Sequence, residues 1–228
     1  MIAIDTLHAC DLGVSQDFLA TVMIVYMDTM CDGANKATRV LQLWARLKDH
    51  YHRYGTENRI QKLTAEMIQS KKKAPKLKAK GAETRALITF ALEMTRAMDQ
   101  KLATTFTNTM YRCAASLINF YMSFEVTPFD PDFTSQSCYD FSILLEALSR
   151  RAERRGDDRR WRVKPKAHLM QELGEYQVYT MGNPRNFWNY KDEDFVGWIA
   201  KLAKTEGGPR SAVTAALKIL NRYRVIRQ

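Results

Sequence analysis

Apolar residues recur at intervals of three and four along most of this 228-residue chain, a spacing that places them on one face of an α-helix. The clearest amphipathic segment covers residues 34–54 and ends at Gly55, where a glycine cap is expected. The same spacing predicts a short helical turn at 64–69 and a helix that begins at Pro165. Further helices are predicted over about 15–30, 83–100, 103–124, 135–151, 190–204 and 209–226.

Two short stretches favour strands instead. Met1–Ile4 is an apolar run that ends at Asp5, and Trp161–Val163 is the second such stretch. The expected fold is therefore mainly α, with seven or eight helices and two or three short strands, in a single domain over 1–228. Within the helix over 135–151, the residues expected to face the core are Tyr139, Ile143, Leu144, Ala147 and Leu148.

The apolar content excludes several classes of protein. The longest strongly apolar stretch, Phe18–Tyr26, lies between Asp17 and Asp28 and is too short to span a bilayer, and no signal-peptide pattern opens the chain. We expect an intracellular protein that has no membrane partner. The four cysteines show no CxxC pair, so buried or inert thiols are expected rather than disulfides or a zinc site.

Two tracts concentrate the positive charge. Residues 71–80 and 150–166 together carry +12, more than the whole net charge of +10. The first tract has little apolar surface and is interpreted as an exposed loop. Clustered cations bind phosphates without reading sequence, and Trp161 could add stacking on a single strand; a solvated charge run is the alternative. The candidate nucleic-acid-binding residues are Lys71, Lys72, Lys73, Lys76, Lys78, Lys80, Arg154, Arg155, Arg159, Arg160, Trp161 and Arg162.

Two carboxylates near opposite ends of the chain are candidates for a metal site. Asp5 follows the first predicted strand, and Glu193 opens a late helix. Mg²⁺ or Mn²⁺ prefers such oxygen ligands, and paired ions serve phosphoryl transfer. The alternatives are a helix cap at Asp5 and a favourable helix dipole at Glu193. His8 and His168 are either ligands or bases, or hydrogen-bonded core residues.

The residues around these carboxylates resemble a known family. Asp5-Thr6-Leu7-His8, followed by Leu12-Gly13-Val14, is similar to the segment that carries the second acidic ligand in transposases of the CACTA and KDZ groups. Lys166-Ala167-His168-Leu169 and the run from Trp188 to Gly197 resemble the segments around their third ligand, a glutamate. The resemblance covers roughly 30 residues at the two ends of the chain.

The resemblance implies a partial RNase H-like core that contains a large helical insertion. Asp5 would be the second carboxylate of a DDE-type triad and Glu193 the third, both of them metal ligands and catalytic residues. Residues 1–30 and 161–228 would carry these motifs, and 31–160 would be the insertion. The position of the first aspartate lies upstream of the second in the family, so this chain has no residue for it, and an incomplete, inactive core is expected.

The sequence therefore predicts a transposase-derived nucleic-acid-binding protein, with DNA favoured over RNA and a nuclear location favoured. Mg²⁺ or Mn²⁺ would be its cofactor if any activity were retained. The alternative function is a helical scaffold in a larger assembly, which docks on RNA or on an acidic protein through its basic loops.

Overall fold

The computed structural model describes residues 3–70, 73–157, 159–190, 197 and 217. The chain divides into two compact units, Met1–Phe187 and Trp188–Gln228, and the helices described below belong to the first. They are η1 (Leu7–Ser15), α1 (Gln16–Met30), α2 (Lys36–Tyr54), α3 (Ala65–Ile68), α4 (Gly81–Ala86), α5 (Ile88–Leu102), α6 (Thr105–Ser123), α7 (Pro131–Arg154), α8 (Pro165–Glu172), η2 (Leu173–Gln177), α9 (Val178–Met181) and η3 (Pro184–Phe187).

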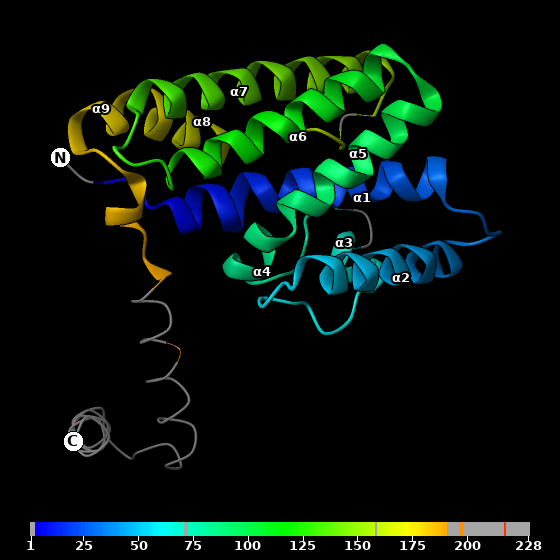
Figure 1. Cartoon of the computed structure of the whole chain (residues 1–228). Coiled ribbons are helices and arrows are strands. Elements are labelled where there is room, and N and C mark those ends of the chain that lie inside the picture. The colour runs from blue at the N-terminus through cyan, green and yellow to red at the C-terminus, as the bar shows by residue number, and fades with distance from the viewer. Residues whose placement is uncertain (1–2, 71–72, 158, 191–196, 198–216, 218–228) are drawn as a thin grey trace. The chain divides into compact units, whose positions relative to one another are not determined.

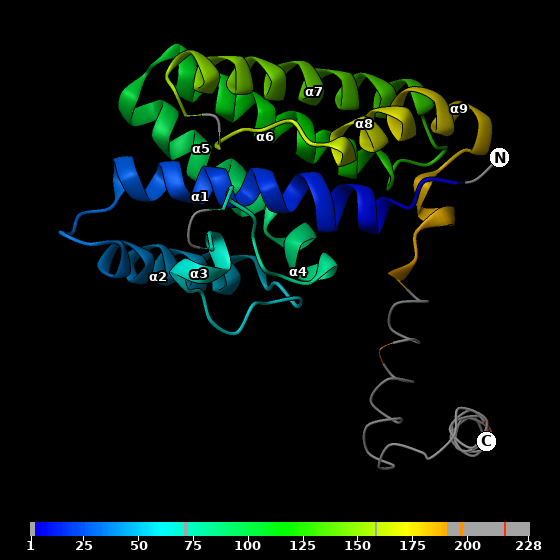
Figure 2. The same cartoon turned by 180° about the vertical axis from the view of Figure 1, so that it is seen from behind.

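Helix α1 forms the centre of this unit. It lies between a layer formed by α5, α6 and α7 and a second group formed by α2 and α3, as both views show (Figure 1, Figure 2). Every residue of Phe18–Met27 is buried, so the helix is covered on all sides. A helix that is apolar all round is stable only in such a position. The π-helix η1 extends α1 toward the N-terminus, and α8 packs against it.

Local sequence signals fix where the long helices begin and end. Asn35 and Asp130 accept hydrogen bonds from the backbone N–H groups of the third residue beyond them, at 3.0 Å in both cases. Thr104 forms a reciprocal capping box with Thr107. Gly55 ends α2 in the left-handed conformation that was expected of it. The predicted boundaries are within two residues of those observed for α2, α3 and α6, whereas the one helix predicted over 83–100 is two helices, α4 and α5, and α7 begins four residues earlier than predicted.

The predicted strands are wrong. Ala3 and Ile4 form no strand, and the second stretch is a turn at Trp161 followed by irregular chain; Met1 and Ile2 lie outside the described residues. Across the part of the chain that is described there is no β-sheet. Because an RNase H-like core is built on a sheet, the expected partial RNase H-like fold is also wrong for these residues. Short apolar runs do not distinguish strands from other buried segments by periodicity alone.

Two expectations about apolar residues need correction. The apolar helix continues from Leu7 to Met30, which is long enough to cross a membrane by length and composition, but 89% of its most apolar window is buried inside the fold. Its place in the core therefore explains why this helix is so apolar. On α7, Tyr139 and Ile143 are 48% and 46% exposed rather than inward-facing.

The lysine tract is also more ordered than an exposed loop. Leu77 is fully buried and Pro75 is buried. The backbone N–H of Leu77 donates to the carbonyl oxygen of Gln16 at 3.1 Å, and that of Lys78 donates to the carbonyl oxygen of Met67 at 2.8 Å. One apolar side chain and these backbone bonds hold residues 74–80 as a strap across the start of α1.

The free cysteines are confirmed as mainly buried thiols. Cys10, Cys113 and Cys138 are fully buried, and Cys31 is partly buried. Burial raises the pKa of the Cys138 thiol to about 12 and raises the pKa values of the other three thiols. A thiol held in its neutral form is a poor nucleophile.

The packing of η2 on α7 depends on a glycine. A Cβ atom on Gly174 would lie 2.5 Å from the Cβ atom and 2.6 Å from the Sγ atom of Cys138. We expect Gly174→Ala to lower the free energy of unfolding by about 1–3 kcal/mol, because these backbones must separate. Urea unfolding measures this. In the double variant Gly174→Ala, Cys138→Gly, the free energy of unfolding should fall by less than the sum of the decreases in the two single variants. If the two decreases simply added, the proposed contact would be contradicted.

Candidate nucleic-acid interface

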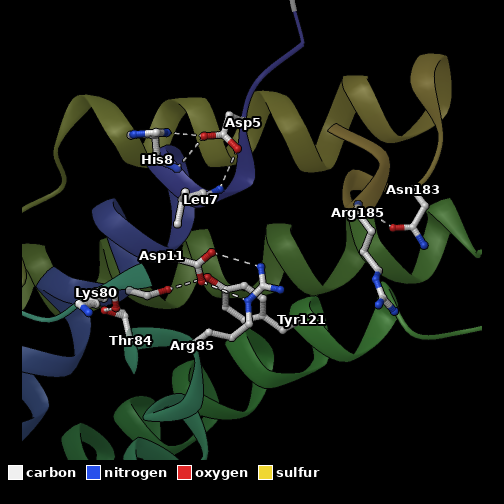
Figure 3. A network of polar contacts seen from close by, with 11 residues as sticks. Asp5, Leu7, His8, Asp11, Lys80, Thr84, Arg85, Tyr121, Asn183 and Arg185 are labelled. Carbon is white, nitrogen blue, oxygen red and sulfur yellow. Dashed lines mark hydrogen bonds and ion pairs between the residues drawn. The ribbon is translucent and has the colours of Figure 1, made fainter. Parts of the chain in front are cut away.

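Asp5 is engaged in capping the first helix. Its carboxylate accepts hydrogen bonds from the backbone N–H of Leu7 at 3.1 Å and of His8 at 3.2 Å, and it pairs with the His8 ring (Figure 3). This is the helix-cap alternative for Asp5. Glu193 lies outside the described residues, so the proposed pairing of Asp5 with Glu193 stays a prediction. Among the residues that are described, no group of three or more His, Cys, Asp or Glu side chains could hold a metal ion.

The histidines singled out from the sequence are not core residues. The His8 side chain is half exposed, and His168 is exposed on α8. The buried histidine is instead His50 on α2, whose Nδ1 lies 3.1 Å from a Glu93 carboxylate oxygen and whose Nε2 lies 3.2 Å from the Thr89 hydroxyl. The three-four pattern of residues 34–54 could have predicted that His50 is buried, because the same helix face carries Leu43 and Leu47.

A buried polar network, which the sequence did not reveal, joins η1 to α4 and α6 (Figure 3). The Asp11 side chain is fully buried, and its two oxygens lie 3.3 and 3.2 Å from Nε and Nη2 of Arg85. The Arg85 guanidinium lies 4.8 Å from the centre of the Tyr121 ring, and the Tyr121 hydroxyl lies 3.0 Å from that of Ser15. Burial raises the pKa of Tyr121 well above its usual value. These contacts hold η1, α4 and α6 together, and we call the Asp11–Arg85 pair with Tyr121 and Ser15 the clamp.

The two basic tracts converge on one backbone atom. The carbonyl oxygen of Leu12, in η1, lies 3.3 Å from Nζ of Lys76 and 3.1 Å from Nζ of Lys166, and accepts a hydrogen bond from each. A carbonyl oxygen has two lone pairs and can accept both. Lys76 lies on the strap and Lys166 on α8, so tracts that are 90 residues apart in sequence meet at the wide turn of η1. π-Helical turns occur frequently at functional sites.

A small hollow, which we call the basic pocket, lies beside this junction. It is bounded by α1, the strap and the segment that leads into α8. Its volume is about 20 Å³, which is room for about one water-sized group. Lys164 donates a hydrogen bond to Asp17 at 2.7 Å inside it. The polar and charged residues that line it are Asp17, Thr21, Arg159, Arg162, Lys164 and Lys166.

Charged groups that line the basic pocket are partly buried, and this burial shifts their pKa values. Burial, followed by the charge of Lys76, lowers the pKa of Lys166. Burial raises the pKa of Asp17, against the opposing hydrogen bond and charge of Lys164. Both shifts mean that the charged forms lack full solvation. Asp17 is the only carboxylate among the lining residues, against four cations.

The candidate residues of the second tract divide into engaged and exposed side chains. Arg160 pairs with Asp28 and with Asp157, at 3.1 Å in each case. Trp161 is 4% exposed, and its ring packs 5.7 Å from that of Phe18, so it is not available to stack on a base. The side chains exposed to solvent are Arg154, Arg155, Arg159 and Arg162.

Of the first tract, Lys73, Lys76, Lys78 and Lys80 are exposed, whereas Lys71 and Lys72 lie outside the described residues. Lys80 also caps α4 through its backbone, where its N–H donates to Glu83 at 2.8 Å. The described part of this tract therefore presents four lysines to solvent. In the second unit, the rings of Trp188 and Tyr190 lie 5.4 Å apart.

Comparisons with protein-family models, with curated proteins and with solved structures found no match. The resemblance to transposases consequently has no support beyond the residues that suggested it.

The clamp gives a test of its structural role. Removing the guanidinium in Arg85→Met should lower the free energy of unfolding by about 3 kcal/mol, because the buried Asp11 carboxylate loses its main cation. Thermal and urea unfolding measure this. The double variant Asp11→Leu, Arg85→Met should regain most of the free energy of unfolding that Arg85→Met loses. If Arg85→Met were as stable as the wild type, the pair would not hold the helices together.

Proposed function

We propose that this protein is a helical nucleic-acid-binding module that binds the phosphate backbone of DNA without reading its sequence. The observation that carries the proposal is the convergence of Lys76 and Lys166 on the carbonyl oxygen of Leu12. It brings one lysine of each basic tract together at η1. Clustered cations of this kind release counterions when they contact phosphates, which gives sequence-independent affinity.

The exposed arginines extend this cationic surface. Arg154 and Arg155 lie at the end of α7, and Arg159 and Arg162 lie between that end and α8. The strap contributes Pro75 to the pocket lining, and its lysines are exposed. Planar guanidinium groups are suited to phosphate oxygens because they donate two parallel hydrogen bonds. The surface thus combines arginines for orientation with lysines as point charges.

The proposal concerns binding and includes no catalytic step. The carboxylate of Asp5 is occupied by the first turn of η1, which is the role of a cap. The Mg²⁺ or Mn²⁺ cofactor and the nuclear location stay predictions from the sequence. DNA is preferred to RNA as the partner, as the sequence-based hypothesis has it, and the experiment below compares the two.

A salt series tests the proposal. The triple variant Arg154→Gln, Arg155→Gln, Arg162→Gln should bind duplex DNA about tenfold more weakly at low salt, and the slope of log K against log salt should fall by up to about 3. Fluorescence anisotropy with two DNA duplexes of unrelated sequence measures both quantities. Both duplexes should be affected equally, because phosphate contacts carry no sequence information.

The matched control also removes three charges, from exposed residues outside the two tracts: Lys36→Gln, Arg96→Gln, Lys101→Gln. It should keep most of the affinity and the slope. Equal losses in both triple variants would show that net charge rather than this surface governs binding. Absence of binding to DNA at low salt would overturn the proposal, and tighter binding to RNA duplexes would replace DNA as its partner.

One observation favours the second candidate function, a scaffold that docks on a protein. An open groove between α7 and α8 is lined by Tyr139, Ile143, Val163 and His168, among others, and the first three side chains are 48%, 46% and 37% exposed. Apolar groups at this exposure are typical of protein contacts. This groove adjoins the basic pocket, because Leu145 and Ala167 line both.

A further inference from the structure

Two ammonium groups lie close together at the Leu12 carbonyl oxygen, and one of them, that of Lys166, belongs to a residue that lines the basic pocket. Because both donate to the same oxygen, Nζ of Lys76 and Nζ of Lys166 are at most 6.4 Å apart, the sum of their two distances to it. A neutral carbonyl only partly offsets the repulsion between two cations at this separation. An anion beside them would be bound with the repulsion relieved.

The backbone of η1 is shaped to allow this arrangement. A Cβ atom on Gly13 would lie 2.6 Å from Cδ and 3.2 Å from Cβ of Lys166. The lysine stem therefore lies directly on the helix surface where only a glycine fits. This contact holds the Lys166 ammonium at the pocket and limits its freedom to turn into solvent.

We propose that the basic pocket binds a phosphate monoester, the terminal phosphate of a nucleic-acid strand. The inference rests on the proposed function, because it specifies which phosphate of the bound strand this part of the surface takes. Lys164, Lys166, Arg159 and Arg162 supply the donors around the group. The floor of the pocket is apolar, formed by Phe18, Leu145 and Trp161, so it offers no competing acceptor.

Charge favours a terminal phosphate over an internal one. A monoester carries a charge of about −1.5 to −2 near neutral pH, whereas a backbone diester carries one negative charge. The lining residues carry four cations and one carboxylate, an excess that matches the monoester. The volume of about 20 Å³ admits about one phosphate oxygen, so the phosphorus and the other oxygens would lie at the mouth of the pocket, and a base cannot enter.

Asp17 sets the affinity of the site. It holds Lys164 by the 2.7 Å hydrogen bond, and it is the one lining residue that repels a phosphate. Replacing it by asparagine keeps an acceptor for Lys164 and removes the negative charge. A gain of binding in Asp17→Asn is therefore expected only if an anion enters the pocket.

The test compares three single-stranded DNA oligonucleotides of one sequence, which carry a 5′-phosphate, a 3′-phosphate or no terminal phosphate. Fluorescence anisotropy at fixed salt should show that wild-type protein binds one phosphorylated form about tenfold more tightly than the unphosphorylated form. Lys166→Met should abolish this preference, and Asp17→Asn should increase it several-fold. Lys101→Met, which removes an exposed cation elsewhere, should leave the preference unchanged. Circular dichroism confirms that each variant is folded.

The outcomes separate this inference from the proposed function. Equal affinity for all three oligonucleotides, with the salt dependence intact, would overturn the phosphate pocket and leave DNA binding in place. Loss of binding to every oligonucleotide and duplex would overturn both. Competition with a nucleoside 5′-monophosphate identifies the source of the phosphate: weak competition supports a strand end, and competition as strong as that of the phosphorylated oligonucleotide would overturn it in favour of a free nucleotide.

Discussion

The burial of one helix on all sides organises the described part of this protein. From Phe18 to Met27 every residue of α1 is covered, by α5 and its neighbours on one side and by α2 and α3 on the other. Each fully buried large apolar side chain contributes about 1.5–3 kcal/mol relative to exposure. A helix in this position cannot shift without opening both groups of helices. Helix α1 therefore holds its N-terminal extension, η1, in a fixed position.

That extension, η1, connects the core to the candidate interface. Its buried face holds Asp11 in the clamp with Arg85, and its open face presents the Leu12 carbonyl oxygen to two lysines. On its buried side η1 thus contacts α4 and α6, and on its open side it binds one lysine from each basic tract. Because the same wide turn serves both contacts, the placement of the basic pocket depends on the integrity of the core.

The strap shows how a charged tract is held in place. Six lysines in ten residues suggest a solvated loop, yet Leu77 is fully buried and backbone N–H groups pair with carbonyl oxygens of Met67 and Gln16. An ordered tract loses less conformational entropy on binding than a mobile one. The packing of Leu77 and the backbone hydrogen bonds offset the repulsion between the like charges of this tract.

Periodicity and capping residues determined the helices, because the three-four spacing and the caps at Asn35, Thr104 and Asp130 act within a few residues. The sequence also identified both basic tracts. It predicted strands at short apolar runs, where local signals are ambiguous, and it gave Trp161 a surface role that burial excludes. Only the tertiary structure decided that Lys76 and Lys166 share the Leu12 oxygen and that Asp11 meets Arg85. Those contacts join residues 64 to 154 positions apart, and such pairings depend on how whole helices pack, which no local pattern encodes.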